Sequence, residues 1–229
     1  MYTLILLSAG RGTRFGKETP KQYLTLAGKP MIVHTLERVN NISEIEEIVI
    51  VCEKEFNCKI QAYLKDYRIT KKVIFTEGGK TRQESVYKGL QVASSSNVIV
   101  HEAARPLVTR KSFMDLINYA AENVTYTYGI PYTVLKKDDQ ENISGILDRK
   151  ELVNIQLPQK FNKADLLKAH EKAVQEQMLF TEDASMVYYY SQKPVACLLG
   201  KSYNIKMTEY IDLLYGEMLI KEDFIKEEE

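Results

Sequence analysis

Short apolar runs rich in β-branched residues alternate along the chain with stretches whose apolar residues recur at helical spacing. The runs predict strands at residues 3–7, 48–52, 73–75, 98–100, 124–130 and 195–199. The helical spacing predicts helices at residues 31–39, 85–92, 113–121, 166–174 and 211–219. The early strands are apolar on both faces, as in a parallel sheet that helices cover on each side. The pattern therefore predicts a three-layer α/β fold with a mostly parallel sheet.

One stretch interrupts this alternation. Residues 133–153 are polar with short strand-like pieces, and turn signals occur at Lys137-Asp138-Asp139 and at Ser144-Gly145. From the pattern alone, the stretch fits a β-hairpin that leaves the main sheet and a solvated loop equally well.

Composition narrows the class of protein. The chain has 229 residues, of which 45% are hydrophobic and 27% charged, which indicates one folded domain over residues 1–229. Its 31 basic residues balance 31 acidic ones, which argues against bulk electrostatic binding to nucleic acid or to an acidic membrane. The N-terminal apolar run is too short for a signal core or a membrane span. Cys52, Cys58 and Cys197 lack metal-ligand spacing, and we expect buried free thiols in a soluble, cytoplasmic protein.

The loop after the first strand carries glycines and cations in close succession. Gly10, Gly12 and Gly16 allow backbone N–H groups to approach a ligand, as phosphate cradles require. Their spacing fits neither the dinucleotide fingerprint nor the Walker A motif, so an NAD-dependent dehydrogenase is a weak interpretation. Three cations near these donors suit a triphosphate: Arg11, Arg14 and Lys21. The alternative is a plain strand-to-helix turn with solvated cations.

Two further loops follow predicted strands and carry polar candidates. Gly79 precedes a predicted helix whose first amides offer an anion or base-edge site, with Arg82 and Ser85 as candidate nucleotide contacts. In the alternative, Ser85 only caps the helix and Arg82 lies on the surface. In the next loop, Glu102 is placed to share a metal with phosphates, and Ala104 permits close approach of a ribose.

Other polar residues have structural alternatives of equal or greater weight. Arg105 either contacts substrate or clamps loop carbonyls. Lys206 precedes the expected helix N-cap Thr208, so it is a candidate for the strand-end cleft. For the remaining polar residues we expect structural roles. Glu182 and Asp183 are expected to be first-turn acids of a helix. His101 is expected to be a half-buried histidine with its hydrogen bonds satisfied, and His34 and His170 to be helix residues without a paired acid.

Taken together, these segments resemble the family of cytidylyltransferases that activate small polyol phosphates. Its members act on 2-C-methyl-D-erythritol 4-phosphate in isoprenoid biosynthesis or on ribitol 5-phosphate in wall teichoic acid biosynthesis. The resemblance covers nearly the whole chain. Five motifs carry it in order: residues 10–16 with Pro20-Lys21-Gln22, residues 78–86, residues 101–106, Leu157-Pro158-Gln159 with Phe161, and residues 204–208.

The resemblance implies a Rossmann-like nucleotidyltransferase fold whose projecting β-arm, here residues 133–153, forms a homodimer. It also implies CTP and a polyol phosphate as substrates, with Mg²⁺ as cofactor. The positions that match its catalytic cations are Arg14, Lys21 and Lys206. The positions assigned to nucleotide binding are Ala9, Gly10, Arg11, Gly12, Gly79, Arg82, Ser85 and Ala104. Those assigned to the polyol phosphate are Arg105, Glu182 and Arg149, the last presented by the arm across the dimer, and Glu102 is assigned to the metal.

The chain departs from the family pattern mainly on the polyol side. It has Glu102 where the family commonly has Asp, and its Glu182-Asp183 exchanges the family's Asp-Glu. Val134-Leu135 and Leu157 replace an Asp-Thr pair and a Thr, which removes hydrogen-bonding groups that would select a polyol. The favoured function is therefore a cytidylyltransferase for a ribitol 5-phosphate-like acceptor. The alternatives are the methylerythritol phosphate enzyme and a nucleotide-binding module that has lost turnover.

Overall fold

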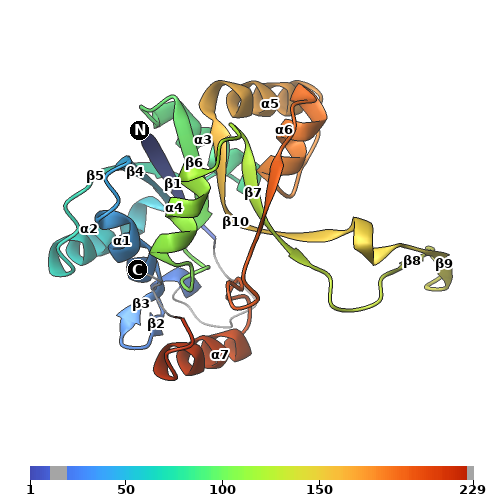
Figure 1. Cartoon of the computed structure of the whole chain (residues 1–229). Helices are drawn as coiled ribbons and strands as arrows, with labels where there is room; N and C mark the ends of the chain where they lie inside the picture. Colours follow the sequence, from blue (N-terminus) through green and yellow to red (C-terminus); the bar gives the residue numbers. More distant parts are fainter. Residues whose placement is uncertain (11–19, 226–229) are drawn as a thin grey trace.

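The computed structural model describes residues 1–10 and 20–225, and within them the central sheet has seven strands in the order β11-β7-β10-β6-β1-β4-β5 (Figure 1). The strands are β1 Tyr2–Leu7, β4 Ile45–Cys52, β5 Lys72–Glu77, β6 Asn97–Glu102, β7 Val124–Gly129, β10 Val153–Asn162 and β11 Ala196–Leu199. Strand β10 runs antiparallel to both of its neighbours, and the remaining neighbours pair in parallel. The mostly parallel sheet predicted from the sequence is confirmed.

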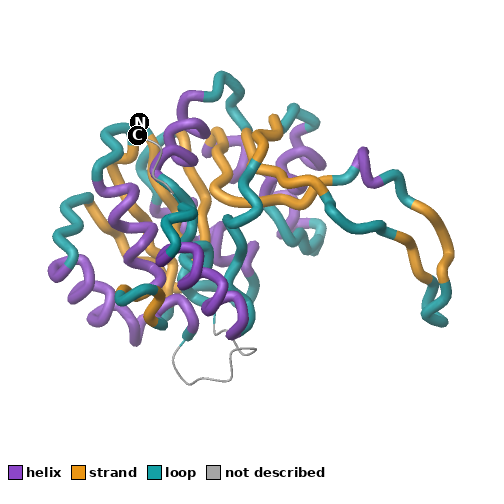
Figure 2. The backbone as a smooth tube through the Cα atoms, turned by 60° about the horizontal axis from the view of Figure 1, so that its bottom comes forward, coloured by secondary structure: helices purple, strands orange, loops and turns teal. Residues whose placement is uncertain are grey.

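Helices cover both faces of this sheet (Figure 2). In β1, Leu4 and Leu6 contribute to one core cluster and Ile5 to another, as the period-2 geometry of a strand requires. The first cluster contains residues of α1 Met31–Asn40, α2 Asn57–Asp66 and α4 Arg110–Asn118. The second contains residues of α3 Arg82–Val92, α5 Lys163–Gln175 and α6 Asp183–Ser191. These two layers around the sheet confirm the three-layer α/β fold.

Several elements begin earlier than the apolar periodicity predicts, because polar caps start them. Helix α3 begins at Arg82, where the N-cap Thr81 accepts a hydrogen bond from the backbone N–H of Glu84. Thr109 starts α4 in the same way. Helix α7 (Tyr210–Lys221) begins after Glu209, one residue beyond the predicted cap, and Asp212 completes a capping box.

The segment between β7 and β10 leaves the sheet as a long arm (Figure 1). It contains an antiparallel hairpin of β8 Leu135–Lys137 and β9 Ile143–Ile146, followed by the 3₁₀ turn η4 Arg149–Glu151. The hairpin interpretation of this stretch is therefore confirmed over the solvated loop.

A third, smaller apolar cluster joins α7 to the short strand β2 Thr25–Leu26, with Leu26, Met207 and Leu213 among its members. Strand β2 pairs with β3 Lys29–Pro30. Two 3₁₀ turns, η2 Lys21–Tyr23 and η3 Lys54–Phe56, complete the short elements. Cys52 is buried as expected, but Cys58 and Cys197 are exposed, so the prediction of three buried thiols is wrong for two of them. Across the described part of the chain, no helix combines the length and apolar character that crossing a membrane requires.

Candidate active site

A cleft of about 930 Å³ opens beyond the carboxyl ends of β1, β4, β5 and β6. This is the position at which open α/β sheets bind ligands. The structure brings nine of the candidate residues to its walls: Ala9, Gly10, Lys21, Gly79, Arg82, Ser85, Glu102, Ala104 and Lys206. Three others, Arg11, Gly12 and Arg14, lie outside the described residues.

The first wall is the chain that leaves β1. Gln22 donates from Nε2 to the carbonyl oxygens of Ser8 (2.5 Å) and Gly10 (3.0 Å), which ties the start of the loop to turn η2. Lys21 precedes Gln22 in the same turn and lines the cleft. The Pro-Lys-Gln motif thus holds a lysine beside the glycine loop.

The second wall is the loop between β5 and α3. A Cβ on Gly78 would collide with the Cβ of Ala9, so glycine is required for this loop to pack against the first one. Ser85 Oγ accepts from the Gly79 N–H at 3.0 Å and donates to the Thr81 carbonyl at 2.9 Å. Ser85 therefore braces the glycine turn at the cleft, and Thr81 is the cap.

The third wall joins the loop after β6 to the segment before α7. The N–H of Met207 donates to the Ala104 carbonyl at 2.8 Å. Arg105 donates from Nη1 to the Asn204 carbonyl at 2.9 Å. These two bonds hold the intervening Lys206 at the cleft, although the two segments are far apart in sequence.

On this wall, the carboxylate of Glu102 lies among three cationic side chains. Its Oε1 lies 3.1 Å from Arg82 Nε and 3.0 Å from Lys206 Nζ, and its Oε2 lies 2.9 Å from the same Lys206 nitrogen. Arg105 Nε lies further away, 3.7 Å from Oε2. Burial alone would raise the pKa of Glu102, but Lys206, Arg82 and Arg105 lower it to about 2. Glu102 is therefore an anion throughout the physiological range.

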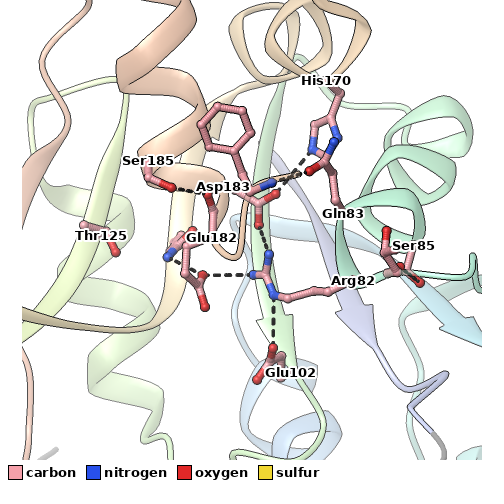
Figure 3. A network of polar contacts seen from close by, with 12 residues as sticks. Arg82, Gln83, Ser85, Glu102, Thr125, His170, Glu182, Asp183 and Ser185 are labelled. Atoms are coloured by element: carbon pink, nitrogen blue, oxygen red, sulfur yellow. Dashed lines mark hydrogen bonds and ion pairs between the residues drawn. The ribbon is translucent and has the colours of Figure 1, made fainter. Parts of the chain in front are cut away.

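Behind the cleft, Arg82 connects Glu102 to the start of α6 (Figure 3). Its Nη1 lies 2.8 Å from Asp183 Oδ2, and its Nη2 lies 3.2 Å from Glu182 Oε2. Although burial opposes it, the three carboxylates raise the pKa of Arg82, with Asp183 contributing most. Arg82 is thus a largely covered bridge from α3 to β6 and α6, and the alternative of a surface arginine is wrong.

Asp183 is fully buried, and its second oxygen, Oδ1, lies 3.3 Å from Nε2 of the equally buried His170. The expectation that His170 has no paired acid is therefore wrong, because α5 and α6 bring residues 13 positions apart into contact. Asp183 lies in the first turn of α6 as expected, whereas Glu182 is the N-cap residue before it and accepts a hydrogen bond from Gln159 Nε2 at 3.2 Å. Burial raises the pKa of Glu182, with Glu102 and Asp183 acting in the same direction.

The three candidates for the polyol phosphate are not among the described residues that line the cleft. Arg105 forms the clamp described above, which is the structural alternative given for it. Glu182 faces Arg82 and Gln159. Arg149 is exposed on the arm, where its Nη1 donates to the Pro131 carbonyl at 3.0 Å.

Within the described residues, no group of three or more His, Cys, Asp or Glu side chains is arranged to hold a metal ion. Both oxygens of Glu102 already lie within 3.1 Å of a cationic nitrogen. These residues therefore form no metal centre of their own. A Mg²⁺ ion at this cleft would therefore depend on the phosphates of a ligand, with Glu102 as at most one protein ligand.

Comparison with known proteins matches nearly the whole chain to one family of enzymes. The model of the family described as IspD, 2-C-methyl-D-erythritol 4-phosphate cytidylyltransferase, matches residues 2–222. A protein of that name from Bacillus cytotoxicus is 36% identical over 222 residues, which are 96% of this chain and 98% of the relative. One from Geobacillus kaustophilus is 37% identical over 225 residues, 96% of each chain.

Solved structures agree with these sequence relatives. The chain is similar to 4-diphosphocytidyl-2C-methyl-D-erythritol synthase from Anaerococcus prevotii, with a TM-score of 0.84 and 26% identity over 96% of both chains. It is also similar to 2-C-methyl-D-erythritol 4-phosphate cytidylyltransferase from Thermus thermophilus, with a TM-score of 0.76 and 25% identity over 95% and 98% of the two chains. These names favour the methylerythritol acceptor over the ribitol acceptor that the sequence pattern favours.

Proposed function

The chain belongs to the 2-C-methyl-D-erythritol 4-phosphate cytidylyltransferase family, and from this premise we propose that it condenses CTP with 2-C-methyl-D-erythritol 4-phosphate. Its class, a CTP-using nucleotidyltransferase, follows from the family, and the acceptor is the proposed part. One structural observation supports the nucleotide half of the proposal: Lys21 and Lys206 line the same strand-end cleft as the glycine loops at Gly10 and Gly79. Cations beside close-packed backbone are what a nucleoside triphosphate needs. The names of the relatives support the acceptor.

In the proposed reaction, a phosphate oxygen of the acceptor attacks the α-phosphorus of CTP. The new P–O bond forms as the bond from the α-phosphorus to the oxygen that bridges to the β-phosphate breaks. Pyrophosphate then leaves with that electron pair. A phosphate monoester has a second pKa of about 6, so the nucleophile is already largely a dianion at neutral pH. The reaction therefore needs positioned charges rather than a general base.

Lys21 and Lys206 are the described residues that supply this charge. Both enter the cleft, and Lys206 reaches it with its Nζ held against Glu102. We propose that they offset the charge that develops on the α- and β-phosphates, together with Arg14. Mg²⁺, when bound by the phosphates, supplies further charge neutralisation.

The arm is proposed to complete the acceptor site of a second copy of the chain. Ile143 and Ile146 are 71% and 86% exposed on it, which suits a surface that a partner covers. Arg149 lies at the base of the hairpin and would present its guanidinium to the acceptor phosphate of the partner.

The test is pyrophosphate release with CTP and Mg²⁺ against a panel of acceptors. We expect turnover with 2-C-methyl-D-erythritol 4-phosphate at a kcat/KM at least about tenfold above that for ribitol 5-phosphate or glycerol phosphate. Preference for ribitol 5-phosphate would overturn the acceptor and retain the class. CTP binding without turnover of any acceptor would indicate a binding module.

A further inference from the structure

Arg82 presents each of its three nitrogens to a different carboxylate. Nε faces Glu102 at 3.1 Å, Nη1 faces Asp183 at 2.8 Å, and Nη2 faces Glu182 at 3.2 Å. A guanidinium is a rigid, planar group, so contacts on separate edges fix both its place and its orientation. Its side chain is 20% exposed, which leaves little solvent to compete for these contacts.

Glu102 and Asp183 hold this guanidinium from two sides (Figure 3). Asp183 is fully buried at the start of α6, lies outside the cleft lining and is packed against His170. Glu102 lies at the end of β6, and its Oε2 is also 2.9 Å from Lys206 Nζ. A continuous series of opposite charges thus runs from the scaffold at Asp183 to the lysine in the cleft.

We propose that Glu102 and Asp183 are a length-matched pair of positioning residues. The longer side chain, Glu102, contacts Arg82 from the cleft, and the shorter one, Asp183, contacts it from the start of α6. Together they set the position of Arg82, and Glu102 in turn sets the position of Lys206. Exchanging one length alone moves a carboxylate by about 1.5 Å, the length of one C–C bond. A displacement of about 1 Å at a catalytic group costs up to about a hundredfold in rate. Combining Glu102→Asp with Asp183→Glu shortens one side chain and lengthens the other by one methylene, so their summed length on the two sides of Arg82 is unchanged.

The test is a double-mutant cycle on the full-length protein, with Glu102→Asp, Asp183→Glu and the combined variant. We expect each single variant to lower kcat at least about tenfold while KM for CTP changes less than about threefold, because the residues act through Lys206. We expect the double variant to turn over faster than either single variant. A double variant at or below the slower single one would overturn the proposal.

A control separates this coupling from general damage to a buried carboxylate. Glu47 is 1% exposed, lies near the amino end of β4 and binds Lys72, so Glu47→Asp shortens a buried acid far from the cleft. We expect its kcat to stay within about twofold of the wild-type value. If Asp183→Glu fails to fold, Asp183→Asn replaces it, with the same loss of kcat expected. Wild-type kcat in folded Asp183→Asn would overturn the role of Asp183.

The turnover readout rests on the proposed function, so the same cycle is also measured by thermal unfolding. We expect each single variant to lower the Tm by at least about 3 °C and the double variant to regain at least half of the larger loss. If the wild-type protein releases no pyrophosphate with any acceptor, the proposed function fails, while recovery of Tm still supports the pair. Additive losses of Tm would overturn the pair whatever the turnover.

Discussion

The Nζ atom of Lys206 lies 2.9 Å from Oε2 of Glu102, although the two residues are 104 positions apart in the sequence. The lysine side chain is 38% exposed and the glutamate 7%, so the pair links a buried anion to a cation that faces the cleft. The ion pair holds Lys206 Nζ at the cleft in the absence of a ligand. If a triphosphate binds there as proposed, its phosphates would compete with Glu102 for this lysine.

Replacement of Lys206 by alanine should act on the chemical step. We expect Lys206→Ala to lower kcat by at least about a hundredfold, because one donor to developing negative charge contributes roughly 3–4 kcal/mol. Lys201→Ala is the matched control, since Lys201 is an exposed lysine in the same segment outside the cleft lining. Steady-state pyrophosphate release measures both, and a kcat near that of wild type for Lys206→Ala would contradict the assignment.

Lys21 should be equally sensitive. It is buried beside the loop that Gln22 fastens, and Lys21→Ala should also lower kcat by at least about a hundredfold. Lys29→Ala removes a lysine that pairs with Glu37 outside the cleft, and we expect unchanged turnover from it. Tm measurements on both variants distinguish a loss of chemistry from a loss of folded protein. A folded Lys21→Ala variant with normal turnover would remove Lys21 from the mechanism.

Much of this arrangement was predictable from the sequence, because the apolar runs and glycine loops are local signals. Strand β10 was not predicted: it contains Pro158 and several polar residues, and its pairing with β6 and β7 comes from tertiary contacts. The apolar residues of helix α6 lack helical periodicity, so only its first-turn acids at Glu182 and Asp183 point to it in the sequence. In the sequence, Glu102 in place of the family's Asp and Asp183 in place of its Glu are two separate departures from the family pattern. The structure places both residues on Arg82.

The names of the relatives favour the acceptor that the sequence pattern ranks second, and the structure gives a physical reason for part of this difference. Leu157 replaces a threonine of the family pattern, but it is fully buried in a core cluster, so this change alters packing rather than the cleft. Val134 and Leu135 lie on the arm, away from the cleft lining of their own chain. The lining of their own cleft therefore does not measure their effect, because the arm is proposed to reach the acceptor site of a second chain.

Acid should remove part of the stability through Glu102. Its pKa falls from an ordinary 4.5 to about 2 in the folded protein, so its contribution is full above pH 4.5 and is lost as the pH falls through 2. The shift corresponds to on the order of 3 kcal/mol. We expect the difference in unfolding free energy between wild type and Glu102→Gln to shrink over this range, as urea titrations at a series of pH values would measure. A constant difference would contradict the ion-pair origin of the shift.

Between pH 6.5 and 4.5 the unfolding free energies of wild type and Glu102→Gln should change with pH in the same way, because His101, which both proteins contain, causes the change. Burial lowers the pKa of this fully buried histidine from 6.5 to about 3. The unfolded chain therefore takes up a proton that the folded protein refuses, and stability falls as the pH drops from 6.5 towards 3. The urea titrations should show this loss equally in wild type and Glu102→Gln between pH 6.5 and 4.5. A loss confined to one of them would contradict it.

Arg105 should prove structural rather than a contact to the acceptor. Its Nη1 bonds the Asn204 carbonyl, so Arg105→Ala removes a clamp that holds the segment of Lys206. We expect a lower Tm by several degrees and a lower kcat, with KM for the acceptor changed less than about threefold. A rise of tenfold or more in that KM, with Tm unchanged, would instead make Arg105 a substrate contact.

Arg149 provides the test of whether two chains share a site. If its guanidinium reaches the acceptor phosphate of a partner, Arg149→Ala should raise KM for the acceptor at least about tenfold and leave KM for CTP unchanged. Lys150→Ala is the control from the same exposed turn. Refolding an equimolar mixture of Arg149→Ala and Lys206→Ala chains should then restore about a quarter of the wild-type sites, because half of the dimers contain one intact pair. Activity of the mixture equal to the mean of the two variants would show that each chain works with its own arm.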